Sequence, residues 1–251
     1  MFAIFNKELR SMFFSPLGYT VIGGFFFINS LIFLGVNFIL PLQSEQQPGS
    51  SLVNVFIYTA YSMVAVISIL SMRFFTEERR MKTDQLLLTS PVRLFDIVLG
   101  KYLAGLAVFA VALALSFTNV IIIAILGKPE WGAVLSSYIG LFFLGAALIA
   151  VSMFISSLTK SQMVAVVLSM VVFIIMIIIN VFLGTIMGFF VDMNVFIKVI
   201  LENLTRLFAV FDQYSGFTQG LLNAPTLIYY MSTVAIFVFL TIRMLEKRRW
   251  E

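Results

Sequence analysis

Six long runs of apolar residues constrain this chain more than any other feature. They cover residues 17–40, 54–72, 102–126, 134–156, 163–184 and 225–244, and none has a charged residue in its interior. A helix of about 20 residues crosses about 30 Å of hydrocarbon. Because a backbone in lipid must satisfy its own hydrogen bonds, and because these runs are too long for barrel strands, we expect six helices. The chain is therefore predicted to be an all-α integral membrane protein with a single domain over residues 1–251.

The overall composition excludes several classes of function. The chain is 61% hydrophobic and 11% charged, with a mean hydropathy of +1.06, whereas soluble domains are about a quarter charged. It contains no cysteine and no histidine, so it lacks thiolate nucleophiles, imidazole bases and the usual zinc ligands. We expect no metal site and no catalytic centre. We assign the net charge of +4 to topology and anionic lipid rather than to nucleic acid.

The distribution of Lys and Arg predicts the orientation of the chain. Thirteen of the sixteen Lys and Arg residues lie in four places: before the first run, between the second and third runs, between the fourth and fifth runs, and from Arg243 at the end of the sixth run onward. Basic residues accumulate on the cytoplasmic side of membrane proteins, so both ends are predicted to be cytoplasmic. An odd number of crossings would destroy this agreement. The first run is too long for a cleavable signal, whose apolar part has about 7–15 residues, so we expect it to be retained as a span.

Two segments outside the runs have helical periodicity. In residues 1–15 the apolar side chains share one face, which is typical of a helix in the membrane interface. The pair Ser15-Pro16 should end this helix and turn the chain into the first span. The amphipathic stretch 185–224 is predicted to form one or two short helices at the outer surface.

The loop between the second and third runs, residues 73–96, holds most of the concentrated charge. Thr83 can cap a helix, three consecutive leucines follow from Leu86, and Pro91 limits the helix. A short amphipathic helix on the cytoplasmic face is predicted within Thr76–Ser90. Alternatively, this segment is a solvated loop whose charges only set the topology.

Polar side chains inside the runs have two interpretations. Asn29, Asn119 and Asn180 lie within the first, third and fifth runs. Polar residues in spans usually form hydrogen bonds across helices, and that is the simpler interpretation. The functional alternative is that these three asparagines line a substrate path. An ion-coupled carrier is poorly supported, because the runs contain no carboxylate or lysine.

Several motifs resemble those of ABC-2-type transporter permeases. The central ones are Glu77-Glu78, then Thr83-Asp84-Gln85-Leu86-Leu87-Leu88-Thr89-Ser90-Pro91, then Ile97-Val98-Leu99-Gly100-Lys101. The opening, Lys7-Glu8-Leu9 through Ser15-Pro16-Leu17-Gly18-Tyr19, and the ending, Leu245-Glu246-Lys247-Arg248-Arg249-Trp250, are similar as well. The closest likeness is to small permeases associated with gliding motility and copper-enzyme maturation. Lys82 and Asp84 depart from the Gly and Glu of the family pattern.

The resemblance implies a membrane subunit that is driven by separate ATPases. Such permeases have six spans, an N-terminal interfacial helix, a cytoplasmic coupling helix and short external helices before the last span. They work as dimers, with a second protomer that is the same or homologous, on two ATPase subunits that bind ATP and magnesium. Carried onto this chain, the ATPase-coupling residues are Glu77, Glu78, Arg79, Arg80, Thr83, Asp84, Leu87 and Pro91. The expected location is the bacterial cytoplasmic (inner) membrane.

The sequence agrees that ATP hydrolysis must come from a partner. It has no G-x-x-x-x-G-K-[ST] motif, because Phe95 stands where a glycine would have to precede Gly100-Lys101. The alternative function is a non-transporting scaffold that transmits ATPase-driven force to partners outside the cytoplasm. A membrane enzyme is less favoured, because the acidic cluster of Glu77, Glu78 and Asp84 lacks a nucleophile.

Overall fold

The computed structural model describes residues 2–39, 52–81, 93–126, 129–189 and 210–250, and within these ranges every regular element is a helix. In chain order the elements are α1 (Phe2–Phe13), α2 (Pro16–Leu34), the π-helix η1 (Gly35–Ile39), α4 (Leu52–Phe74), α5 (Thr76–Arg80), α7 (Leu94–Leu126), α8 (Trp131–Leu158), α9 (Gln162–Phe189), the 3₁₀-helix η2 (Asp212–Tyr214), α11 (Ser215–Thr218) and α12 (Ala224–Trp250).

The prediction of six long apolar helices is confirmed. The helices α2 with η1, α4, α7, α8, α9 and α12 are long and apolar enough to cross a membrane. They are mostly longer than the runs that predicted them, because a helix can continue past its apolar part. The largest difference is in α7, which begins at Leu94 instead of residue 102 and therefore contains Asp96 and Lys101.

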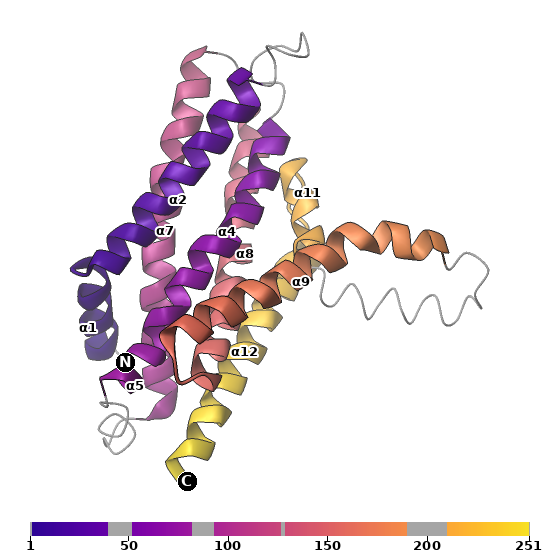
Figure 1. Cartoon of the computed structure of the whole chain (residues 1–251). Helices are drawn as coiled ribbons and strands as arrows, with labels where there is room; N and C mark the ends of the chain where they lie inside the picture. Colours follow the sequence, from indigo (N-terminus) through magenta and orange to yellow (C-terminus); the bar gives the residue numbers. More distant parts are fainter. Residues whose placement is uncertain (1, 40–51, 82–92, 127–128, 190–209, 251) are drawn as a thin grey trace.

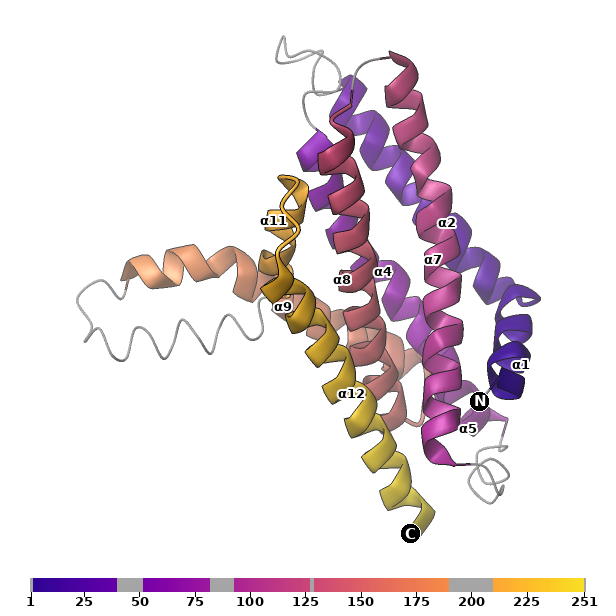
Figure 2. The same ribbon diagram turned by 180° about the vertical axis from the view of Figure 1, so that it is seen from behind.

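The long helices form a bundle with α8 at its centre (Figures 1 and 2). Helix α8 contacts α4, α7, α9, α11 and α12, and 78% of its apolar window is buried. Both termini lie at the same end of the bundle (Figures 1 and 2), as an even number of crossings requires. We call this the terminal end.

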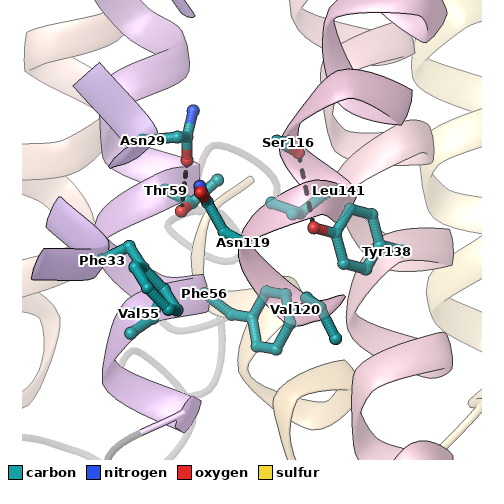
Figure 3. A pocket seen from close by; sticks show the side chains of 10 residues that line it. All are labelled: Asn29, Phe33, Val55, Phe56, Thr59, Ser116, Asn119, Val120, Tyr138 and Leu141. Carbon is teal, nitrogen blue, oxygen red and sulfur yellow. Dashed lines mark hydrogen bonds between the residues drawn. The ribbon is translucent and has the colours of Figure 1, made fainter. Parts of the chain in front are cut away.

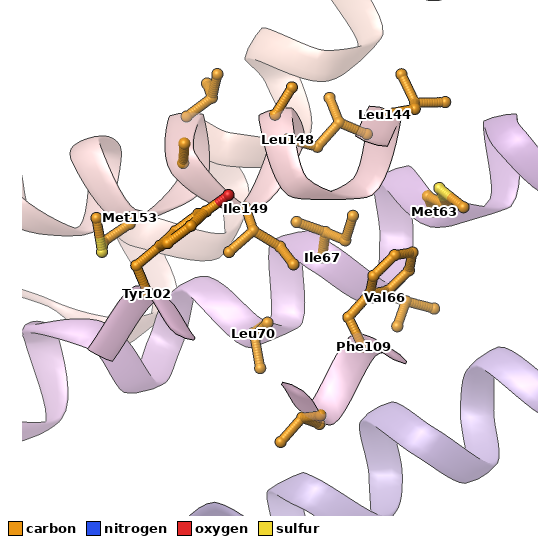
Figure 4. Close-up of a cluster of buried hydrophobic side chains, with 14 of the residues drawn as sticks. Met63, Val66, Ile67, Leu70, Tyr102, Phe109, Leu144, Leu148, Ile149 and Met153 are labelled. Atoms are coloured by element: carbon orange, nitrogen blue, oxygen red, sulfur yellow. The ribbon is translucent and has the colours of Figure 1, made fainter. Parts of the chain in front are cut away.

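Large side chains of α4, α7 and α8 fill the core (Figure 4). Phe109 of α7 is 1% exposed and Met63 and Ile67 of α4 are equally buried. A glycine in α8 allows the closest approach, because a Cβ added to Gly145 would lie 2.2 Å from the ring of Phe109. The chain therefore packs an aromatic ring directly onto the backbone of its central helix.

A tight corner joins α1 to α2. Ser15 caps α2 by accepting a hydrogen bond from the Gly18 amide at 3.3 Å, and Pro16 occupies the first helical position. A Cβ on Gly18 would lie 1.9 Å from the Met12 carbonyl oxygen. The predicted turn at Ser15-Pro16 is thus confirmed, and it depends on a backbone contact that excludes any side chain at Gly18.

Helix α1 places its apolar side on protein. Ile4, Phe5 and Leu9 pack against the hydrophobic core, and α7 is the main neighbour of α1. Lys7 and Arg10 lie on the exposed side. The periodicity of this segment is therefore accounted for by packing on α7, and its position in the membrane interface stays a prediction.

The short helices η2 and α11 are folded against α8 just before α12. The ring of Phe217 is 1% exposed and lies over Gly140, where a Cβ would come within 2.6 Å of it. Its carbonyl accepts a hydrogen bond from the Ser136 hydroxyl at 2.6 Å. These two helices lie at the end of the stretch 185–224, and α9 extends into its start as far as Phe189. The apolar spacing that predicted short helices falls on residues 195–208, which lie outside the described residues, so that expectation stays a prediction.

Helix α9 leaves the bundle, and its far part lies away from the other spans (Figure 1). Only 22% of its described apolar window is buried. Large apolar side chains on its outer surface are exposed, including Met163, Val167 and Ile175. A surface of this kind is suited to lipid or to another apolar helix.

Candidate functional site

The candidate site is the terminal end of the bundle, where α5 joins four other helices. Phe74, Phe75 and Thr76, which link α4 to α5, are all buried. The Phe75 amide donates to the Ser156 hydroxyl of α8 at 3.1 Å. The short helix therefore starts from a fixed position against the end of α8.

Arg73, near the end of α4, and Glu77 of α5 connect this segment to the corner between α1 and α2. Arg73 pairs with Glu77 at 2.9 Å. The same guanidinium donates to the Ser11 carbonyl at 3.1 Å and to the Ser15 hydroxyl. Because Arg73 is 8% exposed, its charge is satisfied by these contacts rather than by water.

Arginines also hold the turn between α8 and α9. Arg79 donates to the carbonyls of Ser157 and Thr159, and Arg80 donates to Gln162 at 3.0 Å. The last carbonyls of a helix have no partner within the helix and carry partial negative charge. Guanidinium groups at the end of α8 therefore fix the turn to α5.

The most deeply buried charge is the ammonium group of Lys101 in α7. It pairs with Glu8 of α1 at 3.2 Å and with Glu78 of α5 at 2.8 Å, and its side chain is only 2% exposed. The ring of Phe75 lies 5.7 Å from the same nitrogen. We call Lys101, Glu8 and Glu78 the ion-pair centre.

Burial affects the acid that is closest to Lys101. Desolvation raises the pKa of Glu78 above its usual value, and the attraction of Lys101 offsets part of this effect. One cation faces two carboxylates in this centre, so one negative charge stays unbalanced within it when both acids are ionised.

The structure brings four of the predicted coupling residues together on α5 and turns most of their charge inward. Glu77, Glu78 and Arg79 bind residues of this chain, as described above, and Arg80 is exposed together with Met81, which is 70% exposed. The other predicted residues, Thr83, Asp84, Leu87 and Pro91, lie outside the described residues, as does most of the predicted helix Thr76–Ser90.

The sequence patterns did not predict that Lys101 and Glu8 belong to a site. Lys101 stands out in the sequence only as part of the Gly100-Lys101 motif, and Glu8 only as part of the opening motif. The available signal was the position of Lys101 itself, a lone cation between the apolar residues Val98 and Tyr102. An ionisable residue in such a position is rare and needs a partner.

A second polar group lies between α2, α4, α7 and α8 (Figure 3). Asn29 is 3% exposed; it accepts a hydrogen bond from Thr59 at 2.6 Å and donates to the Phe25 carbonyl at 2.8 Å. Asn119 accepts from Ser30 at 3.4 Å. Two of the three predicted asparagines thus meet, whereas the side chain of Asn180 lies outside the described part of α9.

These residues line a small cavity of about 20 Å³, which is room for one water molecule. Its polar walls are Asn29, Thr59, Ser116, Asn119 and Tyr138, and we call this set the amide–hydroxyl pocket. The rings of Phe33 and Phe56 complete the walls. The pocket is neutral, and it lies away from the terminal end, beyond the middle of α2.

The part of the chain that the structure describes contains no group of three acidic residues that could hold a metal ion. The polar chemistry of the described residues is therefore that of ion pairs, amides and hydroxyls.

A protein-family model described as "ABC-2 family transporter protein" matches residues 2–245. No curated protein matches the chain.

Proposed function

The chain belongs to the ABC-2 family of transporter proteins, and we propose that it is the permease subunit of an ATP-driven transporter. In this role it converts ATP hydrolysis by a separate ATPase into movement of its spans. The six apolar helices and the match over nearly the whole chain support this proposal.

The observation that carries the proposal is the connectivity of α5. This helix of five residues contacts the ends of α4 and α9, bonds to the α8–α9 turn through Arg79 and pairs with α7 through Glu78. A displacement of such a helix reaches several spans at once, because packed elements move as rigid bodies. A segment that receives force from outside the bundle needs this kind of connectivity.

The proposed orientation puts the terminal end in the cytoplasm. This end carries Lys7, Arg10, Arg80 and Lys160 on its exposed surface, and the positive-inside rule assigns such an end to the cytoplasm. Helix α1 would then lie near the inner interface, and η2 with α11 would lie towards the outer side. The membrane would be the cytoplasmic (inner) membrane of a bacterium.

The proposed assembly contains two copies of an ATPase and a second permease protomer, which is the same or homologous. The ATPases would bind ATP and magnesium. The ATPase would dock on the exposed Arg80 of α5 and on Met81, which follows α5, together with the predicted contacts Thr83, Asp84, Leu87 and Pro91. Membrane lipid would cover the apolar surfaces that the second protomer leaves free.

The proposal can be tested with the ATPase that a neighbouring reading frame would encode. The two proteins are co-expressed, extracted and reconstituted into lipid nanodiscs. We expect them to purify as one complex and the permease to stimulate ATP hydrolysis. A chain that purifies alone and leaves the hydrolysis rate unchanged would contradict the proposal.

A charge reversal localises the docking surface. Arg80→Glu changes an exposed residue of α5, and Arg243→Glu changes an exposed residue of α12 at the same end of the bundle. We expect the first variant to weaken co-purification and the second to leave it unchanged, because charge complementarity acts locally. Reversal of Glu78 is a poorer probe, since it would also break the pair with Lys101.

The alternative of a force-transmitting scaffold makes a different prediction in the same nanodiscs. A transporter's hydrolysis responds to its cargo, so a panel of amphipathic and lipid-like compounds should contain one that changes the rate. A scaffold would couple to the ATPase equally well but would ignore every compound.

A further inference from the structure

The Gly100-Lys101 pair of α7 fastens two separate elements, and this goes beyond the docking role of α5. We infer that Gly100 and Lys101 form a seat that fixes α1 and α5 relative to each other, so that Lys101 is a positioning residue for force transfer. The inference about force transfer rests on the proposed function, whereas the inference about the seat does not.

The first half of the seat is steric. Helix α1 lies close to α7 at Gly100, where a Cβ would lie 3.0 Å from Ile4 Cγ2 and 3.4 Å from the Phe5 amide nitrogen. The neighbouring Ile97 and Val98 are buried at 1% and 0% exposure. A glycine at this position thus provides the flat surface on which α1 lies.

The second half of the seat is electrostatic. The ammonium of Lys101 binds Glu8 of α1 and Glu78 of α5 at 3.2 and 2.8 Å. The carboxylates are 13% and 17% exposed, so the pairs are weakly screened. Without the cation the two acids would repel each other, and α5 would keep its other link to α1, in which Arg73 binds both Glu77 and the Ser11 carbonyl.

A purely stabilising role and a positioning role can be separated by removing all three charges. Replacing a buried charge group with neutral residues of similar volume usually preserves the fold, whereas removing one partner does not. The triple variant Glu8→Gln/Glu78→Gln/Lys101→Met should therefore fold. It lacks both ion pairs of Lys101 but keeps the Arg73 contacts with Glu77 and Ser11, and so tests what Lys101 adds to the position of α5.

The seat itself is tested on the chain alone. Because the protein contains no cysteine, Asn6→Cys on α1 and Met81→Cys after α5 can carry spin labels at two exposed positions. In nanodiscs we expect a narrow distribution of label distances in the parent and in Lys101→Arg, and a broad one in the triple variant. An unchanged distance distribution in the triple variant would show that the ion pairs of Lys101 do not fix α5 relative to α1.

Force transfer is tested in the complex with the ATPase. We expect the triple variant still to bind the ATPase. Its stimulation of ATP hydrolysis should fall about tenfold, which is a typical size for coupling between sites. The matched control Arg243→Met/Glu246→Gln removes an exposed ion pair of the same bundle end and should hydrolyse ATP at the parent rate. Full stimulation in the triple variant would overturn the positioning role.

The two proposals fail in distinguishable ways. If the parent chain neither binds nor stimulates an ATPase, the proposed function is wrong. The label distances still test whether Gly100 and Lys101 fix α1 relative to α5. If the parent stimulates hydrolysis and the triple variant does so equally, the proposed function stands and the positioning role of Lys101 is wrong.

Discussion

The ion-pair centre and the amide–hydroxyl pocket both connect helices inside the bundle, but they do so with different chemistry. Each joins helices that are distant in sequence, and each is buried. The first uses full charges on Lys101, Glu8 and Glu78 at the terminal end. The second uses only neutral groups, such as Asn29 and Thr59, deeper in the bundle. The difference follows the cost of burying charge, which is greatest at mid-membrane depth.

The comparison indicates a division of tasks. Neutral hydrogen bonds between spans contribute about 0.6 kcal/mol on average, so they orient helices that packing already holds. Charges in a buried group interact more strongly but fail together when one partner is lost. The elements held by charge are α1 and α5, which are too short to span a membrane and have less surface to bury.

The largest effect should come from breaking the ion-pair centre at its cation. Lys101→Met leaves Glu8 and Glu78 as partly buried carboxylates without their cation, and we expect a loss of stability approaching the roughly 3–5 kcal/mol of a fully buried unpaired charge. Unfolding of the purified protein in mixed micelles, titrated with SDS, measures it. Adding Glu8→Gln and Glu78→Gln should restore most of the loss, and a stable Lys101→Met protein would contradict the comparison.

A smaller effect is expected in the amide–hydroxyl pocket. Thr59→Val removes the donor to Asn29 while keeping the side-chain shape, and should cost about 1 kcal/mol in the same titration. Thr241→Val is the matched control, because Thr241 is equally buried but bonds only to the Phe237 carbonyl of its own helix. Equal losses in the two variants would show that the contact between spans adds nothing.

Within the pocket, Tyr138→Phe should change stability by only a few tenths of a kcal/mol. The Tyr138 hydroxyl lies 3.4 Å from the Ser116 hydroxyl, which is long for a bond between hydroxyl groups. Its ring remains packed against those of Phe56 and Phe117. A loss as large as that of Thr59→Val would reveal a stronger network than the geometry indicates.

The smallest effect should be a pH dependence that belongs to the ion-pair centre alone. Burial raises the pKa of Glu78, so the folded protein binds a proton more readily than the unfolded chain does. The stability of the parent relative to Glu78→Gln should therefore rise as the pH falls from above the folded pKa towards the ordinary value of 4.5. Melting temperatures of both proteins across this range check the sign, and a relative decrease would contradict it.

The sequence predicted the parts of the fold that depend on local pattern. Six spans follow from the length of apolar runs, and the corner at Ser15-Pro16 follows from capping and proline geometry. These features need no knowledge of which helix lies beside which.

The candidate site was less predictable, because its partners are far apart in the chain. Glu78 was predicted as an ATPase-coupling residue, but no local pattern indicates its ion pair with Lys101 of α7. Asn29 and Asn119 were both singled out, but the Thr59 and Tyr138 that share their pocket were not. The third apolar run begins at residue 102, just after Lys101. The predicted span therefore leaves out the one cation that α7 buries.

The corner at Gly18 has a mechanical consequence. Because the backbone of α2 touches the Met12 carbonyl there with no side chain between them, the joint cannot flex without a clash on one side. We therefore expect a displacement of α1 towards this contact to move α2 with it instead of bending the corner. Only 28% of the apolar window of α2 is buried, so few contacts inside the bundle oppose such a movement of the helix.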